Sequence, residues 1–220
     1  MTSFAQRAGW LINALLLLGC GALAGSAGDS GPWKEVSRSG DLVVYERVHD
    51  GSSIREFKAI GTIDADAAVV KRVIDDVDEY PHFMPYMTET RVISTDGNTR
   101  VTYARLSPPV VGDRDYTIRV HCETRRDAAG NTCFCNRWET ANELGPAEKS
   151  GVTRVKVSEG SWLLQPTQAG RKTQATYCIY SDSGGAIPAF LANAACKTAI
   201  PKLFEAIGKQ AALPKYSLKK

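Results

Sequence analysis

A run of β-rich segments between residues 89 and 181, followed by a single long apolar helix, constrains the fold of this chain most. Residues that form turns, such as Asp96-Gly97 and Pro108-Pro109, separate the segments. Strands joined by short turns pair in antiparallel fashion, so the run predicts one antiparallel sheet. The expected strands cover residues 89–95, 98–106, 115–125, 132–140, 152–158, 161–166 and 172–181.

A hairpin and a helix are expected before this run. Residues 42–49 and 54–63 are rich in β-branched residues, and Asp50-Gly51 between them is typical of a hairpin turn. Asp64 is a good N-cap for a helix over 65–76, where apolar residues recur at helical spacing. Residues 28–41 predict a further short helix ahead of the hairpin.

The last long element is a helix that Pro188 opens and that reaches about Gln210. Its apolar residues form one broad stripe, which a curved antiparallel sheet buries against its concave face. The predicted fold is therefore α+β, with a curved sheet of about nine strands gripping a long C-terminal helix. The space between sheet and helix is either filled by side chains or forms a ligand cavity.

The first 24 residues have the features of a secretory signal. An apolar run at 10–18 follows Arg7 and is shorter than the roughly 20 residues that span a bilayer. The residues before Cys20 are similar to a lipobox, which would place a lipid on that cysteine, whereas 22–24 suit ordinary signal peptidase. The sequence thus predicts a signal over 1–24, a domain over 28–213 and a basic tail over 214–220.

Composition fits one exported globular domain. With 43% hydrophobic residues, 23% charged residues and a net charge of +3, the chain is neither disordered nor a multi-span membrane protein. The charge is too close to zero for a nucleic-acid-binding surface. We expect a monomer in the periplasm or anchored in the bacterial envelope.

The cysteines leave two alternatives open. Export places the chain where disulfide bonds form, and Cys122 flanks the turn at 127–131 opposite Cys133 and Cys135. A cross-strand disulfide from Cys122 to one of them is the first alternative, and small apolar filling is the second. Together with His121, Cys133 and Cys135 lack the spacing of a structural zinc site, so we expect no metal.

Four segments, in this order, resemble the START family of lipid-transfer domains: 76–85 (DVDEYPHFMP), 111–116 (VGDRDY), 161–177 (SWLLQPTQAGRKTQATY) and 184–193 (GGAIPAFLAN). The resemblance covers about residues 30–212. It implies a helix-grip fold with a tunnel under the C-terminal helix that holds one hydrophobic ligand, usually a lipid or a sterol. It implies no cofactor.

Strand alternation predicts which residues face that tunnel. Tyr116, Ile118 and Val120 share one face of their strand, and large apolar residues at analogous positions mark the later strands. Tyr103 and Arg105 are expected at the mouth of the cavity. The alternative for each aromatic residue is simple core filling. The full set of expected ligand contacts is Tyr103, Arg105, Tyr116, Ile118, Val120, Trp138, Trp162, Leu164, Tyr177, Ile179, Phe190, Leu191 and Ala194.

One departure from the family bears on the ligand. Several START-like domains carry a buried arginine on the strand after the Arg-Asp-Tyr motif and an acidic partner on the preceding strand. The aligned positions here hold Val120 and Ala104. Compared with these relatives, the resemblance then implies a more apolar wall, and a sterol- or hopanoid-like ligand in preference to a phospholipid.

No catalytic motif is present: the sequence lacks a Gly-x-Ser-x-Gly elbow, a phosphate-binding loop and His-Glu-x-x-His. Binding without turnover is the first expectation. The second is a helix-grip enzyme acting on a small hydrophobic substrate, with Tyr103, Arg105 or Asp115 as acid or base. The third is an envelope protein whose core is filled.

Two features of the C-terminal region allow a structural and a functional interpretation. Pro201 interrupts the long helix, either to let it follow a curved sheet or to form a hinge for ligand uptake. The lysines near the C-terminus form either a solvated tail or a transient contact with an anionic membrane.

Overall fold

The computed structural model describes residues 31–109, 111–185 and 187–218. The predicted signal over 1–24 and the lipidation site at Cys20 lie outside these residues. Within the described ranges, no helix combines the length and the apolar character needed to cross a bilayer.

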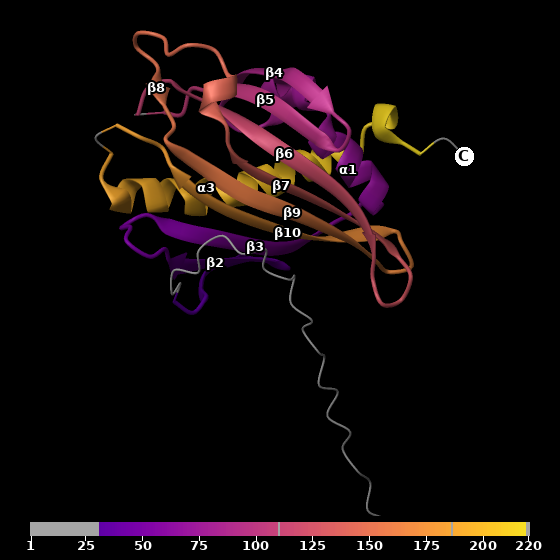
Figure 1. Cartoon of the computed structure of the whole chain (residues 1–220). Helices are drawn as coiled ribbons and strands as arrows, with labels where there is room; N and C mark the ends of the chain where they lie inside the picture. The colour runs from indigo at the N-terminus through magenta and orange to yellow at the C-terminus, as the bar shows by residue number, and fades with distance from the viewer. Residues whose placement is uncertain (1–30, 110, 186, 219–220) are drawn as a thin grey trace, which may run out of the picture.

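One curved sheet of ten strands forms the body of the molecule (Figure 1). Nine strands follow in the spatial order β1-β2-β3-β10-β9-β7-β6-β5-β4, and each neighbouring pair is antiparallel. The short β8 pairs with β6 in parallel fashion. The strands are β1 Lys34–Ser39, β2 Leu42–Val48, β3 Arg55–Ile63, β4 Met87–Asp96, β5 Thr99–Leu106, β6 Arg114–Arg126, β7 Thr132–Thr140, β8 Thr153–Arg154, β9 Val157–Thr167 and β10 Lys172–Asp182.

The helices lie on the concave face of the sheet. They are α1 Ala67–Asp75, α2 Tyr80–Phe83 and α3 Ala189–Ala211, with single 3-10 turns η1 Val77–Glu79, η2 Asn142–Leu144 and η3 Pro214–Tyr216. The buried face of α1 includes Val69, Val70 and Val73, and α1 contacts both α3 and the sheet. The predicted α+β class and the long C-terminal helix are therefore confirmed (Figure 1).

Three predicted elements differ from the structure. The stretch expected to form a short helix contains β1, an exposed edge strand that Gly40, at a φ of +60°, connects to β2. The two strands expected over 152–166 are the short β8 and one continuous β9. Asp66 caps α1 in place of Asp64, because its Oδ1 accepts a hydrogen bond from the Ala68 amide at 2.7 Å.

The chain end is held against α1. Tyr216 is 4% exposed, and its hydroxyl donates to Asp76 Oδ2 at 2.7 Å and accepts from Gln210 Nε2 at 3.1 Å. Arg72 of α1 donates to the carbonyl of Ser217 at 3.0 Å. The start of the predicted basic tail is thus packed against the domain.

Candidate ligand-binding site

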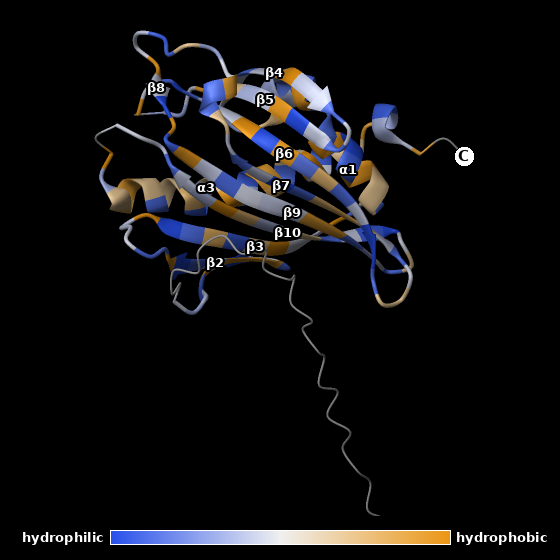
Figure 2. Cartoon of the chain, viewed as in Figure 1, coloured by the Kyte–Doolittle hydropathy of each residue, from blue (hydrophilic) through white to orange (hydrophobic). Residues whose placement is uncertain are grey.

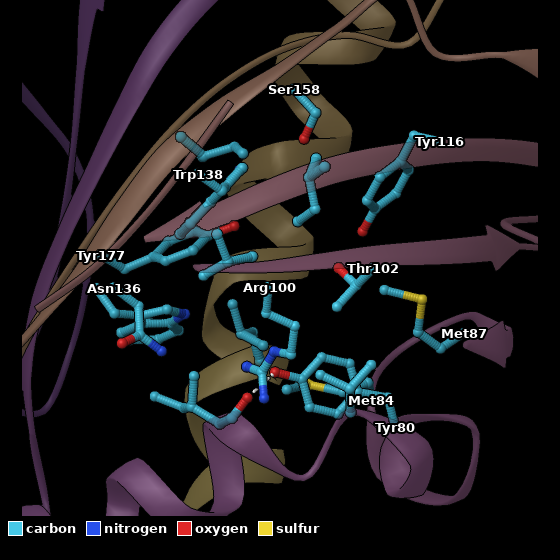
Figure 3. A pocket seen from close by; sticks show the side chains of 17 residues that line it. Tyr80, Met84, Met87, Arg100, Thr102, Tyr116, Asn136, Trp138, Ser158 and Tyr177 are labelled. Atoms are coloured by element: carbon cyan, nitrogen blue, oxygen red, sulfur yellow. Dashed lines mark hydrogen bonds between the residues drawn. The ribbon is translucent and has the colours of Figure 1, made fainter. Parts of the chain in front are cut away.

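A cavity of about 160 Å³ lies between the concave face of the sheet and the helices (Figure 3). Helices and their connections form its floor, five strands form its wall, and α3 covers it. The floor comes from Ile74, Val77, Tyr80, Met84 and, at the start of β4, Met87. The wall and cover come from Arg100, Thr102, Tyr116, Ile118, Val120, Asn136, Trp138, Ser158, Trp162, Tyr177, Ile179 and Leu203.

Aromatic rings form the apolar end of the wall. The centroid of Tyr177 lies 4.5 Å from that of Trp162 and 5.8 Å from that of Trp138. Gly160 lies opposite Trp138 across β7 and β9, and a Cβ there would overlap the indole of Trp138. The glycine therefore lets this indole lie over β9 and close one side of the cavity.

Seven of the residues expected from the sequence line the cavity. They come from β6, β7, β9 and β10, where one face of the sheet points to solvent and alternation is informative (Figure 2). The seven are Tyr116, Ile118, Val120, Trp138, Trp162, Tyr177 and Ile179. Their contact with a ligand stays a prediction.

Tyr103 and Arg105 are not at the cavity mouth, which corrects the expectation. Tyr103 pairs with Thr117 on the outer face of the sheet, where its hydroxyl donates to Asp115 Oδ2 at 3.2 Å. Arg105 Nε donates to Asp113 Oδ2 at 3.1 Å. The middle of β5 is buried on both faces, so a polar residue on this strand does not have to face the cavity.

Four other expected contacts also lie away from the cavity lining. Leu164 faces inward but is packed in the core, at 2% exposure. Phe190 is 70% exposed, and Leu191 and Ala194 are exposed as well. The apolar stripe of α3 turns toward the core only from Ile200 onward, so the first turns of the helix lie outside the lining.

The predicted cross-strand disulfide is wrong for this structure. Cys122 pairs with Asn136, whereas Cys133 pairs with Arg125 and Cys135 with Glu123. Cys122 therefore points to the opposite face of the sheet from Cys133 and Cys135, and strand geometry cannot bring the sulfur atoms together. In the described part of the chain, no group of three His, Cys, Asp or Glu side chains could hold a metal ion.

Polar residues of the lining were missed by the sequence analysis. Arg100 and Thr102 share the inner face of β5, and Asn136 shares the inner face of β7 with Trp138. Period-two alternation carried back from Trp138 reaches Asn136, and carried back from Ala104 it reaches Thr102 and Arg100. The prediction named mainly apolar and aromatic residues and therefore omitted an arginine and an amide.

Arg100 supplies an ion pair that the sequence comparison did not predict. Its Nη1 donates to the backbone carbonyl of Asp75 at 2.8 Å, and its Nη2 lies 3.3 Å from Asp75 Oδ1. The Arg100 side chain is 16% exposed and its cross-strand partner is Val120. Arg100, on the neighbouring strand, therefore places a charged group beside Val120. The expectation that the cavity wall has no buried ion pair, based on Val120 and Ala104, is wrong.

The tyrosines of the lining act as neutral groups. Burial raises the pKa of Tyr116 to about 12, and it also raises the pKa of Tyr80 and of Tyr177. The Tyr80 hydroxyl donates to the Ile74 carbonyl. These phenols stay protonated at neutral pH, so they can donate hydrogen bonds but are poor bases.

A comparison with protein-family profiles shows which family the chain belongs to. The sequence profile of the family described as polyketide cyclase / dehydrase and lipid transport matches residues 63–207. The chain belongs to this family. The predicted resemblance to START domains and the helix-grip fold are also confirmed.

Two curated proteins are similar to the chain in sequence. An uncharacterized protein of Pseudomonas aeruginosa is 29% identical over 162 residues, 73% of this chain and 77% of the relative. The phosphatidylcholine transfer protein of Rattus norvegicus is 25% identical over 190 residues, 84% of this chain and 86% of its own.

Two solved structures share the fold. A STAR-related lipid transfer protein fragment from Xanthomonas axonopodis has a TM-score of 0.73 at 24% identity, covering 82% of this chain and 99% of that one. Human StAR-related lipid transfer protein 5 has a TM-score of 0.67 at 15% identity, covering 81% and 86%.

Proposed function

We propose that this protein binds one hydrophobic lipid in the cavity under α3 and carries or sequesters it in the bacterial envelope. The observation that carries the proposal is a cavity enclosed by Trp138, Trp162 and Tyr177 inside a fold whose family includes lipid transport. Burial of apolar ligand surface contributes roughly 25 cal/mol per Å², which offsets the cost of immobilising the ligand. The similarity to phosphatidylcholine transfer protein supports the lipid class.

The volume of the cavity sets a condition on this function. About 160 Å³ is close to an engineered cavity of roughly 150 Å³ that admits benzene, and ordinary ligand pockets measure about 300–1,000 Å³. A lipid therefore needs the cover to move outward. In α3, residues 189–199 are less buried than the turns after Pro201, and we assign the hinge to Pro201.

The exposed start of α3 suits a membrane surface. Phe190 is 70% exposed and Leu191 46% exposed, next to the part of the cover that has to move. Large apolar residues exposed together mark contact sites with proteins or membranes. We assign them to transient contact with the bilayer while the ligand passes in or out.

For the ligand we favour a neutral sterol- or hopanoid-like lipid over a phospholipid. Most of the lining is apolar, and the charge of Arg100 is balanced by Asp75. A phosphate would enter as an additional, desolvated charge, which is costly unless a free cation meets it.

A second candidate is an enzyme acting on a small hydrophobic substrate, because a cavity of about 160 Å³ fits a small molecule without movement of α3. The residues first expected to act as acid or base do not favour it. Tyr103 bonds to Asp115, Arg105 bonds to Asp113, and none of these residues lines the cavity.

The test is to express residues 29–220 in the periplasm of a bacterial host, purify the protein without detergent, and compare native with denaturing mass spectra. We expect a stoichiometric lipid-sized mass that is released on denaturation. A protein that carries nothing and takes up no sterol, hopanoid or phospholipid would overturn the proposal. Turnover of an added ligand would favour the enzyme.

A further inference from the structure

Two buried polar atoms of the cavity lining have no hydrogen-bond partner among the residues that the structure describes. They are Nε of Arg100, a donor, and Oδ1 of Asn136, an acceptor. Asn136 is 6% exposed, and both side chains line the cavity. Buried polar atoms are nearly always partnered, because an unmet donor or acceptor costs stability. Such a pair in a cavity therefore indicates a place for a polar ligand group.

The two side chains are held next to each other by one carboxylate oxygen. Asp75 Oδ1 accepts from Asn136 Nδ2 at 3.0 Å and from Arg100 Nη2 at 3.3 Å. The contact with Asp75 also fixes the amide orientation, since an amide oxygen facing the carboxylate would be repelled. The carbonyl of Asn136 is thus left for another donor. Figure 3 shows Arg100 reaching from the sheet into the space between Asn136 and Tyr80.

The oxygen atoms of this cluster disfavour an anion at the two unpartnered atoms. Asp75 pairs with Arg100 and also with Lys71. A carboxylate or phosphate that approaches Arg100 Nε would meet the lone pairs of Asn136 Oδ1 and the nearby carboxylate of Asp75. A hydroxyl group meets no such repulsion, and it both accepts and donates.

We propose that Arg100 and Asn136, held by Asp75, form a recognition site for a lipid hydroxyl group. The hydroxyl accepts from Arg100 Nε–H and donates to Asn136 Oδ1, while the hydrocarbon body lies against Trp138, Trp162 and Tyr177. This inference rests on the proposed lipid binding, and it identifies the chemical class of the polar end as a neutral alcohol.

The test uses three ligands with the same chain: decan-1-ol, its methyl ether 1-methoxydecane, and decanoate. Binding is followed by the fluorescence of Trp138 and Trp162 in the Trp33→Phe background. We expect the alcohol to bind about tenfold more tightly than the ether, the equivalent of one hydrogen bond to a buried acceptor. Decanoate should bind more weakly than the alcohol.

Variants separate the two halves of the site. Asn136→Leu removes the acceptor, so the alcohol and the ether should then bind within about twofold of each other. Arg100→Met removes the donor and should weaken both ligands about fivefold or more. If Arg100→Met does not fold, Arg100→Lys is used in its place. It keeps a positive charge beside Asp75 but lacks the Nε–H donor. Thr102→Val, also in the lining, is the matched control and should leave the alcohol-to-ether ratio unchanged.

The outcomes distinguish this site from lipid binding in general. Equal affinity for all three ligands, tighter binding of decanoate, or an unchanged ratio in Asn136→Leu would overturn the hydroxyl site and leave the proposed function standing. If none of the three ligands binds to a folded wild-type protein, this inference fails, and the uptake of sterol, hopanoid or phospholipid decides the proposed function separately.

Discussion

The two halves of α3, before and after Pro201, contact the protein in different ways. After the proline, Phe204 and Ile207 are at most 7% exposed, and Phe204 lies 5.4 Å from Trp162 between ring centroids. Before it, only Ile200, directly next to the proline, is buried; Cys196 packs partly against the core, and Asn193 and Lys197 make polar contacts to the sheet. One helix therefore combines a second half that is anchored in the hydrophobic core and contributes Leu203 to the cavity lining with a first half that is held by a few replaceable contacts.

The first half of α3 is attached to the sheet by two polar contacts. Asn193 Oδ1 accepts from the backbone amide of Arg55 at 2.9 Å, and Lys197 Nζ lies 2.8 Å from Glu46 Oε2. Such contacts can be exchanged for water at small cost, whereas burial of Ile207 cannot. Pro201 lacks the N–H that would bond to the carbonyl of Lys197, so the two halves are also weakly joined to each other.

The largest effect is expected in the anchor. Ile207→Ala removes a fully buried side chain and should lower the free energy of unfolding by about 2–5 kcal/mol. Urea unfolding followed by circular dichroism measures this. A loss below about 1 kcal/mol would mean that the second half of α3 is no anchor.

The second largest effect is expected on the rate of ligand exchange when Pro201, between the two halves of α3, is replaced. Pro201→Ala restores the missing backbone hydrogen bond, so we expect ligand exchange to slow about tenfold, equivalent to roughly 1.4 kcal/mol in the barrier to opening. Equilibrium affinity should change little. Stopped-flow transfer of a fluorescent sterol to vesicles measures the rate, and an unchanged rate would remove the hinge.

A smaller effect in the opposite direction is expected at the cover. Asn193→Ala removes the bond to the Arg55 amide, worth about 1 kcal/mol, and should speed ligand exchange about fivefold. The same transfer assay applies, with Thr198→Ala as the control because that hydroxyl bonds only within its own helix. Equal rates in the two variants would contradict the assignment.

The smallest effect on stability is expected at Phe190. Phe190→Ser alters an exposed side chain and should change the free energy of unfolding by at most about 0.5 kcal/mol. Vesicle cosedimentation of the same variant should nevertheless decrease. Loss of stability without loss of vesicle binding would assign Phe190 to the fold in place of the membrane contact.

The sequence predicted the elements whose signals are local. Turn residues such as Asp50-Gly51 and Asp96-Gly97 delimit the hairpins, and helical spacing of valines marks α1. It missed β1 because the residues of this strand are polar and largely exposed, so they carry no alternation. An edge strand of this kind is fixed by its pairing with β2, which is not a local property.

Prediction of the site succeeded where strand alternation applied. Alternation located Tyr116 and Trp138 on strands with one solvent-exposed face. Tyr103 was expected at the cavity mouth as a polar residue, but it lies on the outer face, where it bonds to Asp115, and Arg154 bonds to the same carboxylate. Alignment with START-like domains placed Val120 at the position of the buried arginine, and this alignment cannot identify an arginine on another strand. The arginine that reaches this region belongs to the neighbouring strand, and only the strand register joins Arg100 to Val120.

The fastening of the chain end to α1 has a practical consequence for protein production. Tyr216 bonds to Asp76, next to the floor of the cavity and close to Asp75, which holds Arg100 and Asn136. A truncation before Tyr216 removes this bond, and a purification tag fused after Lys220 can disturb it. Either change would affect the position of the residues that shape the polar end of the cavity. Binding experiments therefore need the tag at the other end of the domain, ahead of β1.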